Sequence, residues 1–151
     1  MKRMLIFLLV LMLLPAWALT EKAWVLCQPD SYVICRYWPK KSDEIAGFLY
    51  CGDPVETTGK TKNGYAQIYC DFETCEGWVY AGYLVYDEPY EVNERRVITS
   101  IARVRARRTI NGKLRRWLYN GDTITVYWES AKWAVTSQGY IKTELTGDYD
   151  P

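Results

Sequence analysis

Histidine is absent from all 151 positions of the sequence. A histidine base activates the nucleophile in Ser-His and Cys-His enzymes, so its absence excludes both systems. Histidine is also a usual zinc ligand, and an all-thiolate zinc site needs four cysteines in closely spaced pairs. Only two of the five cysteines, Cys70 and Cys75, lie close together in the chain. We therefore expect no metal and no other cofactor.

Carboxylate-only catalysis remains open, because a glycosidase needs only two acidic residues across a cleft. The candidates Asp71, Glu73 and Glu76 fall in one acidic loop. A module of about 60 residues has a small core and little room for a cleft that would raise a carboxyl pKa. A solvated loop is the favoured interpretation, and the sequence predicts a protein that is not an enzyme.

Long apolar runs are absent except near the N-terminus. Lys2 and Arg3 precede an apolar run from Met4 to Pro15, and Ala16-Trp17-Ala18 gives the small-x-small pattern of a signal-peptidase site. The run is shorter than the roughly 20 apolar residues of a membrane-spanning helix, so an anchor is the weaker interpretation. We expect residues 1–18 to be a cleaved signal peptide. The mature protein is then secreted, extracellular or in the cell envelope, without stable membrane insertion.

Cysteine is absent after Cys75. In an exported protein, disulfides are the default state of cysteine. With five cysteines, at least one thiol is free or pairs between chains. Alternation along the strand from Tyr65 to Cys70 turns Cys70 inward, where it could bridge to Cys27 or to Cys75. We favour Cys27–Cys70, because closing the longer loop removes more entropy from the unfolded chain.

The two halves of the mature chain share landmarks in one order, which indicates an internal duplication. The offset between matched segments falls from 71 to 62 residues, as differing loop lengths would produce. The alignment places Cys35, as a buried thiol, at the inward position that Ala106 fills in the second copy. The matched pairs are Val33–Arg36 with Val104–Arg107, Leu49–Asp53 with Leu118–Asp122, Val55–Thr58 with Thr123–Val126, Asn63–Ala66 with Ala131–Ala134, and Gly77–Val79 with Gly139–Ile141.

Within each copy, short runs rich in Val, Ile, Tyr, Trp and Thr alternate with polar residues and are punctuated by Gly, Asn, Asp or Pro. This alternation predicts β-strands, and no segment of the mature chain has a sustained helical period. Strands this short cover their edges by closing into a small barrel. We therefore predict an all-β protein with two tandem β-barrels, residues 19–86 and 96–147. A charged, proline-containing linker over residues 87–95 would join them.

These motifs resemble those of bacterial SH3-like (SH3b) domains. The second copy looks degenerate, with Tyr140 in place of a tryptophan and Glu144-Leu145 in place of a final Tyr-Leu. The resemblance covers nearly all of residues 24–146 and implies two SH3-like barrels. It also implies binding to peptidoglycan or another cell-envelope polymer, which such domains commonly target. The first copy carries the motifs as Val33–Arg36, Leu49–Asp53, Tyr65–Ile68, Gly77–Val79 and Tyr83-Leu84.

Aromatic residues in loops are the candidate ligand contacts, because their rings give a large contact area and keep a polar tip. Tyr37 and Trp38 begin the loop expected to border the groove of an SH3-like barrel. Tyr80 and Tyr83 would form the opposite wall of that groove. Aromatic residues on the matched strands are expected to pack in or near the cores.

Charge is divided between the halves: residues 19–91 carry 6 basic and 12 acidic residues, and residues 92–151 carry 11 basic and 6 acidic. Strand alternation places Arg103, Arg105 and Arg107 on one outer face. Three interpretations stay open: a solvated edge protected by charge, a surface for an anionic wall polymer, and docking onto the acidic first module.

Export argues against a nucleic-acid partner, although similar charge with stacking aromatics would suit one. The preferred partner is a cell-wall glycan or peptide. The alternative is a protein-interaction role, as an adaptor or inhibitor module that binds an envelope protein.

Overall fold

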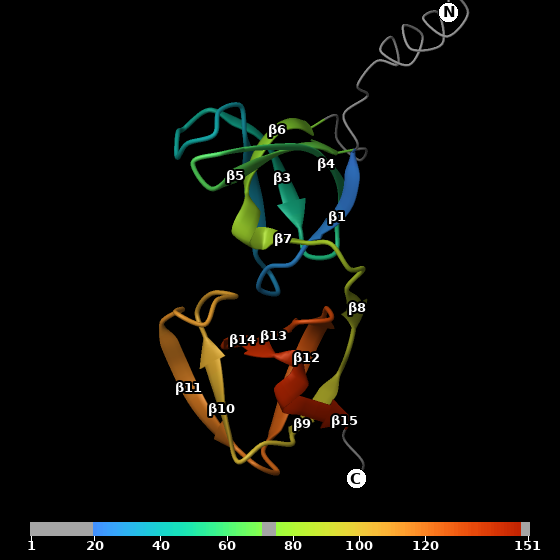
Figure 1. Cartoon of the computed structure of the whole chain (residues 1–151), viewed down its shortest axis with the longest axis vertical. Coiled ribbons are helices and arrows are strands. Elements are labelled where there is room, and N and C mark those ends of the chain that lie inside the picture. Colours follow the sequence, from blue (N-terminus) through green and yellow to red (C-terminus); the bar gives the residue numbers. More distant parts are fainter. Residues whose placement is uncertain (1–19, 71–74, 149–151) are drawn as a thin grey trace, which may run out of the picture.

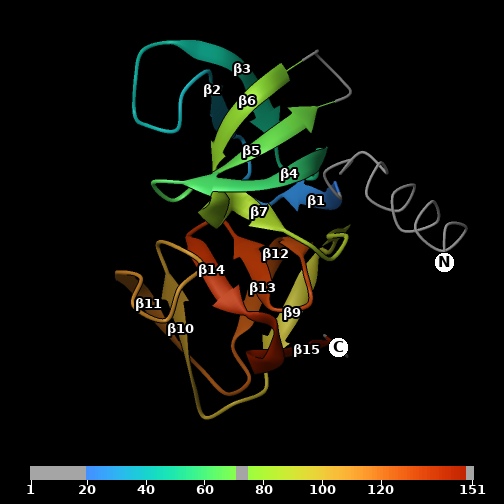
Figure 2. The same ribbon diagram turned by 45° about the horizontal axis from the view of Figure 1, so that its top comes forward.

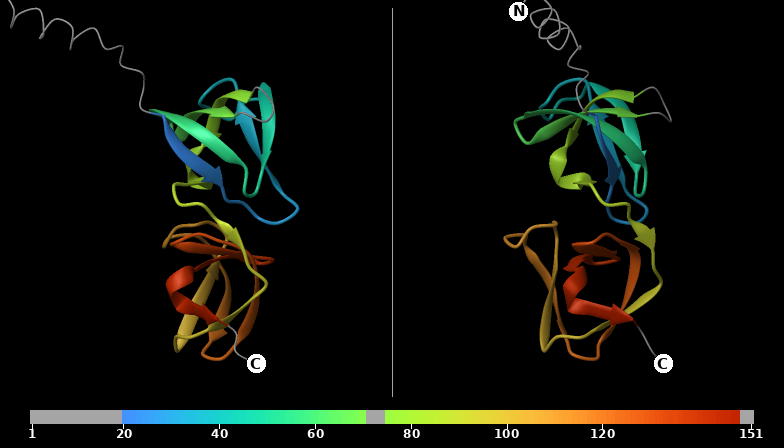
Figure 3. Two further views of the ribbon diagram at one scale, coloured as in Figure 1. Left: turned by 90° about the vertical axis from the view of Figure 1, so that its right-hand side faces the viewer. Right: turned by 45° about the vertical axis from the view of Figure 1, so that its right-hand side comes forward.

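The computed structural model describes residues 20–70 and 75–148, and the predicted signal peptide lies outside them. Strands make up most of these residues, and no α-helix occurs in them. The strands form two antiparallel sheets, one in each half of the chain, stacked along the long axis of the molecule (Figures 1 and 3). The predicted all-β fold class is confirmed. We call residues 20–86 the first module and residues 90–148 the second module.

The two modules share one topology: their strands lie in the same order in the two sheets. Each strand of the first sheet corresponds to the strand of the second sheet whose number is higher by eight. The orders are β3-β2-β6-β5-β4-β1-β7 and β11-β10-β14-β13-β12-β9-β15, with β8 paired to β12. This agrees with the predicted duplication. The first module contains β1 (Glu21–Val25), β2 (Tyr32–Arg36), β3 (Ile45–Tyr50), β4 (Pro54–Lys62), β5 (Tyr65–Cys70), β6 (Cys75–Tyr80), the 3₁₀ turn η1 (Ala81–Tyr83) and β7 (Leu84–Val85). The second contains β8 (Tyr90–Glu91), β9 (Glu94–Val97), β10 (Ile101–Arg105), β11 (Leu114–Tyr119), β12 (Thr123–Glu129), β13 (Trp133–Thr136), β14 (Gly139–Lys142), the 3₁₀ turn η2 (Thr143–Leu145) and β15 (Thr146–Asp148).

The same tight turn joins β3 to β4 in the first module and β11 to β12 in the second. Gly52 and Gly121 occupy it with φ values of 90° and 89°, a region open to glycine without a steric penalty. The backbone N–H of Tyr50 donates to the carboxylate of Asp53 at 2.7 Å, and the backbone N–H of Tyr119 donates to that of Asp122 at 2.8 Å. Each Gly-Asp pair therefore folds as its local sequence predicts.

A second glycine in each module lets two strands approach closely. A Cβ on Gly77 would lie 2.4 Å from the carbonyl oxygen of Arg36, and a Cβ on Gly139 would lie 2.3 Å from that of Arg105. A larger residue would push β6 away from β2, or β14 away from β10. The close backbone contact thus requires a glycine in each Gly-aromatic motif. Because Gly77 contacts Arg36 and Gly139 contacts Arg105, the two arginines occupy equivalent positions.

The strand pairing corrects the predicted alignment of the second strands. Arg36 pairs with Trp78, and Arg105 pairs with Tyr140. Arg105 therefore takes the place that the alignment gave to Arg107, a shift of two residues. Because side chains alternate with a period of two, an even shift leaves the inward and outward faces unchanged.

Cys35 consequently matches Val104 and not Ala106. Both Cys35 and Val104 are fully buried, and the burial predicted for Cys35 is confirmed. Ala106 follows the end of β10, where it is half-buried. The sequence alignment is shifted because the Val-x-x-Arg motif of the second copy, Val104–Arg107, begins two residues after the segment that is structurally equivalent to Val33–Arg36.

Three clusters of buried side chains hold the fold together. Two fill the interiors of the modules, and the third lies between the modules, where β1 and β7 face β12, β13 and β14 (Figure 2). Apolar burial contributes about 25 cal/mol per Å² of area removed from water, so this third cluster stabilises one arrangement of the modules. It consists of Leu26, Val85, Val135 and Tyr140, packed against Trp24, Cys51, Trp128 and Trp133.

Residues 87–95, predicted as a linker, contain paired strand. β8 pairs with β12 across Trp128 and Glu129, and β9 begins at Glu94. The backbone N–H of Ala131 also donates to the Asp87 carboxylate. The strand pairing of the second module therefore starts before the predicted boundary at residue 96.

Cys27 is outside any disulfide in the structure, where the sequence predicted a bridge to Cys70. β4 lies between β1 and β5 in the sheet, and Cys27 follows the end of β1 that adjoins the β3–β4 turn. Its neighbouring cysteine there is Cys51, whose sulfur accepts the backbone N–H of Cys27 at 3.3 Å. At the end of β5, the backbone of Cys70 pairs instead with that of Cys75.

Candidate ligand-binding groove

An arginine at the end of β2, and its equivalent at the end of β10, each hold the loop that follows the strand. Arg36 Nη1 donates to the carbonyl oxygen of Ser42, and Arg105 Nη1 donates to that of Gly112 at 2.9 Å. Equivalent arginines therefore fix equivalent loops.

The first-module loop, residues 37–44, lies beside the turn between β4 and β5. Asn63 Nδ2 in that turn donates to the carbonyl oxygen of Pro39 at 3.1 Å. The next residue, Gly64, lies under the ring of Tyr80, which would be 3.2 Å from a Cβ on this glycine. The loop and Tyr80 therefore flank the same two-residue turn.

The four aromatic residues predicted to bind ligand are all exposed. The exposed fractions of Tyr37, Trp38, Tyr80 and Tyr83 are 57%, 53%, 46% and 38%. Trp38 Nε1 donates to Glu44 Oε2 at 2.6 Å, which fixes the indole against its own loop. Tyr80 and Tyr83 meet edge to face, with ring centroids 6.1 Å apart. The structure thus joins the two tyrosines on one side of the turn and keeps Trp38 on the loop.

The second module has a groove of about 480 Å³ at the equivalent place. Lys142 ends β14 and Leu145 ends η2, so they take the places of Tyr80 and Tyr83 in the first module. The apolar walls are Ile101, Ile110, Trp133 and Leu145. The charged lining residues are Arg103, Arg105, Lys142 and Glu144. We call this hollow the basic groove.

The basic groove carries three cations and one carboxylate. Lys142 Nζ lies 2.6 Å from Glu144 Oε1, but both side chains are well exposed, and an exposed pair contributes little. Arg103 stacks over the Trp117 ring at 4.8 Å from its centroid, a cation–π contact that orients the guanidinium. The electrostatics of the groove therefore favour an anionic ligand.

Arg107 is not part of the basic groove. β10 ends at Arg105, and a register shift between Val104 and Arg105 interrupts the ladder there. The predicted common outer face therefore holds for Arg103 and Arg105, which line the groove, whereas Arg107 is exposed outside it.

Arg108, which the sequence did not single out, connects the modules. Its Nη2 donates to the carbonyl oxygens of Gly82 and Leu84, the latter at 3.2 Å. Burial lowers the pKa of Arg108. One member of the basic run thus docks onto the first module, but through backbone carbonyls and not through acidic side chains. No residue-level signal separates Arg108 from its arginine neighbours.

The outward faces of the β2–β3 and β10–β11 hairpins carry exposed apolar side chains, another feature that the sequence reasoning missed. Tyr32 meets Phe48 edge to face across the first hairpin, with centroids 5.0 Å apart. Alternation in these strands could have revealed them, because the outward positions are apolar as well. The set comprises Tyr32, Phe48, Tyr50, Ile101, Trp117 and Tyr119.

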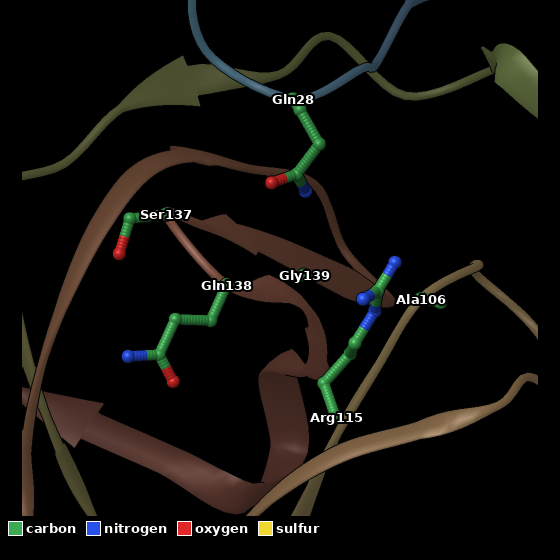
Figure 4. Close-up of a pocket in the computed structure, with 6 residues that line it drawn as sticks. All are labelled: Gln28, Ala106, Arg115, Ser137, Gln138 and Gly139. Atoms are coloured by element: carbon green, nitrogen blue, oxygen red, sulfur yellow. The ribbon is translucent and has the colours of Figure 1, made fainter.

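A second hollow, of about 460 Å³, lies at the boundary between the modules (Figure 4). Gln28 extends toward it from the first module, and Arg115 extends toward it from β11. Nearby, burial raises the pKa of Tyr140 to about 12, while Gln28 and Arg108 act in the opposite direction. Arg115 is the one charged lining residue, so this hollow is less suited to an anionic polymer than the basic groove.

Within residues 20–70 and 75–148, no three His, Cys, Asp or Glu side chains are grouped as metal ligands. In the same described part of the chain, no helix has the length and apolar character needed to cross a membrane.

No protein-family model and no curated protein match the chain. Among solved structures it is similar to NlpC2 from Trichomonas vaginalis, with 13% identity and a TM-score of 0.39 over 89% of this chain and 50% of that one. It is also similar to NlpC1 from Trichomonas vaginalis, with 14% identity and a TM-score of 0.41 over 89% of this chain and 48% of that one. The chain thus spans about half the length of these structures. Likeness at this level assigns neither a family nor an activity.

Proposed function

We propose that the chain is an exported, non-catalytic binding protein of two SH3-like modules that recognises peptidoglycan or another anionic polymer of the cell envelope. The observation that carries the proposal is the basic groove. It combines three cations with apolar walls at the position where the first module presents exposed aromatic residues.

The chemistry of the groove suits a polymer that alternates charged and apolar faces. Arg103 and Lys142 supply donors for carboxylate or phosphate oxygens. Trp133 lies in the same lining and offers a flat apolar surface for a sugar ring or a short side chain. Peptidoglycan has both features, because its stem peptides carry carboxylates and its glycan carries apolar ring faces.

The contact between the modules supports binding at two places by one polymer. The apolar cluster and Arg108 hold the basic groove and the exposed aromatic residues of the first module at a fixed spacing. The second contact is therefore gained without the entropy of ordering a free linker. A long polymer benefits from this arrangement more than a short soluble peptide does.

A second candidate function, an adaptor for an envelope protein, is favoured by the exposed apolar faces of the two hairpins. Exposed apolar side chains that lie side by side on the outward face of a hairpin are typical of protein–protein contacts. In this case the partner would cover Tyr32, Phe48 and Tyr50 of the first hairpin, and the basic groove would stay open.

Sedimentation with purified sacculi tests the proposal. Arg103→Gln combined with Lys142→Gln should weaken binding about tenfold or more, since charge-assisted hydrogen bonds contribute about 1.5–3 kcal/mol. Arg107→Gln removes the same type of charge outside the groove and is the matched control, with binding close to that of the wild type. Equal loss in both variants, or retention in both at every salt concentration, would rule out the groove, and the adaptor role would then lead.

A further inference from the structure

Two cysteines of the first module meet beside the second module: Cys27, which follows β1, and Cys51, which lies in the β3–β4 turn. The backbone N–H of Cys27 donates to Cys51 Sγ at 3.3 Å, and the two thiols are hydrogen-bonded to each other. The Cys27 thiol has a second acceptor within reach, the carbonyl oxygen of Ser31 at 3.8 Å. Both cysteines are outside any disulfide in this structure.

The backbone holds these two sulfurs in place. The N–H of Gly52 donates to the carbonyl oxygen of Val25 at 2.7 Å, and the N–H of Val25 donates to that of Asp53 at 2.9 Å. These two bonds fasten the exit of β1, just before Cys27, to the residues that follow Cys51 in the β3–β4 turn. They hold the backbone of Cys27 beside the Cys51 sulfur.

The two thiols differ in the way that thiol–disulfide exchange requires. The hydrogen bond from Cys27 lowers the pKa of Cys51, and the Arg108 cation acts in the same direction. The hydrogen bond to Cys51, together with burial, raises the pKa of Cys27. Cys51 is only half-buried, whereas Cys27 is buried with 2% of its surface exposed. An oxidant therefore reaches Cys51 first. Cys51 is therefore the attacking thiolate and Cys27 the resolving thiol.

We propose that Cys27 and Cys51 form a disulfide bond in the exported protein, by exchange with an oxidised thiol compound such as a disulfide oxidoreductase or oxidised glutathione. The proposal rests on export, which belongs to the proposed function, but not on the ligand of the basic groove.

The disulfide forms in two exchange steps. Cys51 thiolate attacks one sulfur of the donor disulfide, the donor S–S bond breaks, and the other donor sulfur leaves and takes up a proton. Cys27 then attacks the Cys51 sulfur of the mixed disulfide, and the Cys27 proton passes to the second departing donor sulfur. The protein loses two electrons, and the donor disulfide is reduced to two thiols.

The position of the bridge links it to the contact between the modules. Cys51 packs in the intermodule cluster, and the adjacent Gly52 lies under the ring of Trp128 from the second module. A disulfide at Cys51 would fix the turn on which the second module rests. Oxidation should therefore stabilise the first module and its contact with the second together.

Peptide mapping of the unreduced mature protein tests the inference. The protein is equilibrated with oxidised and reduced glutathione, free thiols are blocked with N-ethylmaleimide, and cross-linked peptides are identified by mass. We expect a Cys27–Cys51 peptide, and a fall in Tm of about 10 °C when dithiothreitol is added. Cys51→Ala should abolish that dependence on reductant, whereas Cys35→Ala, which removes a cysteine outside the pair, should keep it.

The wild-type mapping is decisive even if a variant fails to fold. Alkylation of both Cys27 and Cys51 after oxidation, or a cross-link from Cys27 to Cys70, overturns the inference. Sedimentation with sacculi is measured on the same preparation. A protein that binds sacculi without this bridge leaves the proposed function standing, and a bridged protein that does not bind refutes the function alone.

Discussion

Trp128 of the second module lies against Gly52 of the first, with a ring carbon 2.6 Å from the position that a Cβ on Gly52 would take. The equivalent Gly121 sits in the same turn of the second module with nothing within 4 Å. One turn is thus covered by a neighbouring module and its copy is open, which provides a matched pair of sites.

Gly52→Ala should destabilise the protein more than Gly121→Ala. Both substitutions strain a backbone with φ near 90°, at a cost of about 1–2 kcal/mol each. Only Gly52→Ala also displaces Trp128 and opens the contact between the modules, which adds about 1–3 kcal/mol. Urea denaturation of both variants measures the difference, and equal losses would show that the modules do not depend on this contact.

Arg95→Met should destabilise the second module strongly. Glu129, with 4% of its side chain exposed, accepts hydrogen bonds from Arg95 Nε at 2.9 Å and from the Tyr90 hydroxyl at 2.7 Å. Removing Arg95 leaves a buried carboxylate without its cation, a change that costs about 3–5 kcal/mol. Chemical denaturation should show this loss, and adding Glu129→Leu to Arg95→Met should recover much of it. If the double variant is as unstable as the single one, the loss does not come from the unpaired charge.

The stability of the protein should fall in alkaline solution because of Tyr140. Burial raises the pKa of this phenol to about 12 from an ordinary value of 10, although Arg108 and Gln28 act in the opposite direction. Below pH 10 the phenol is neutral in both the folded and the unfolded states. Between pH 10 and 12 the unfolded state ionises and the folded state resists, so the free energy of unfolding drops by about 2–3 kcal/mol.

Tyr140→Phe isolates this effect. The variant should lose less stability than the wild type between pH 10 and 12, as measured by urea denaturation at fixed pH values. Tyr90, whose pKa is also raised, chiefly by its hydrogen bond to Glu129, stays in both proteins and cancels in the comparison. Identical pH profiles for the two proteins would mean that Tyr140 ionises without cost in the fold.

The sequence is most informative where structure is local. The turns at Gly52 and Gly121 could be predicted because a glycine with positive φ and an aspartate that bonds the preceding backbone need no distant partner. The alternation of β10 likewise places Arg103 and Arg105 outward without knowledge of the fold. Both arginines line the basic groove.

Long-range pairing is where sequence reasoning fails. The Val-x-x-Arg spacing indicated that Arg107 is the equivalent of Arg36 in the second copy. In the sheet the equivalent residue is Arg105, because β14 approaches β10 at Gly139. Loop-closure entropy likewise favours Cys70 as the partner of Cys27, whereas the strand order sets Cys27 beside Cys51. Such choices are decided by contacts between segments distant in sequence.

Trp38→Ala distinguishes a two-site polymer from a ligand bound by charge alone. If the polymer also contacts the first module, loss of this exposed indole should weaken sedimentation with sacculi by about 1–3 kcal/mol, as for one stacked aromatic anchor. Tyr69→Ala removes a comparably exposed aromatic side chain near the end of β5, away from the β4–β5 turn beside which the Trp38 loop lies. This control should leave binding unchanged. If charge dominates, binding should instead fall steeply with salt, as the screening length shortens to about 8 Å at physiological ionic strength. Trp38→Ala would then bind as the wild type does, and the basic groove would be the sole contact.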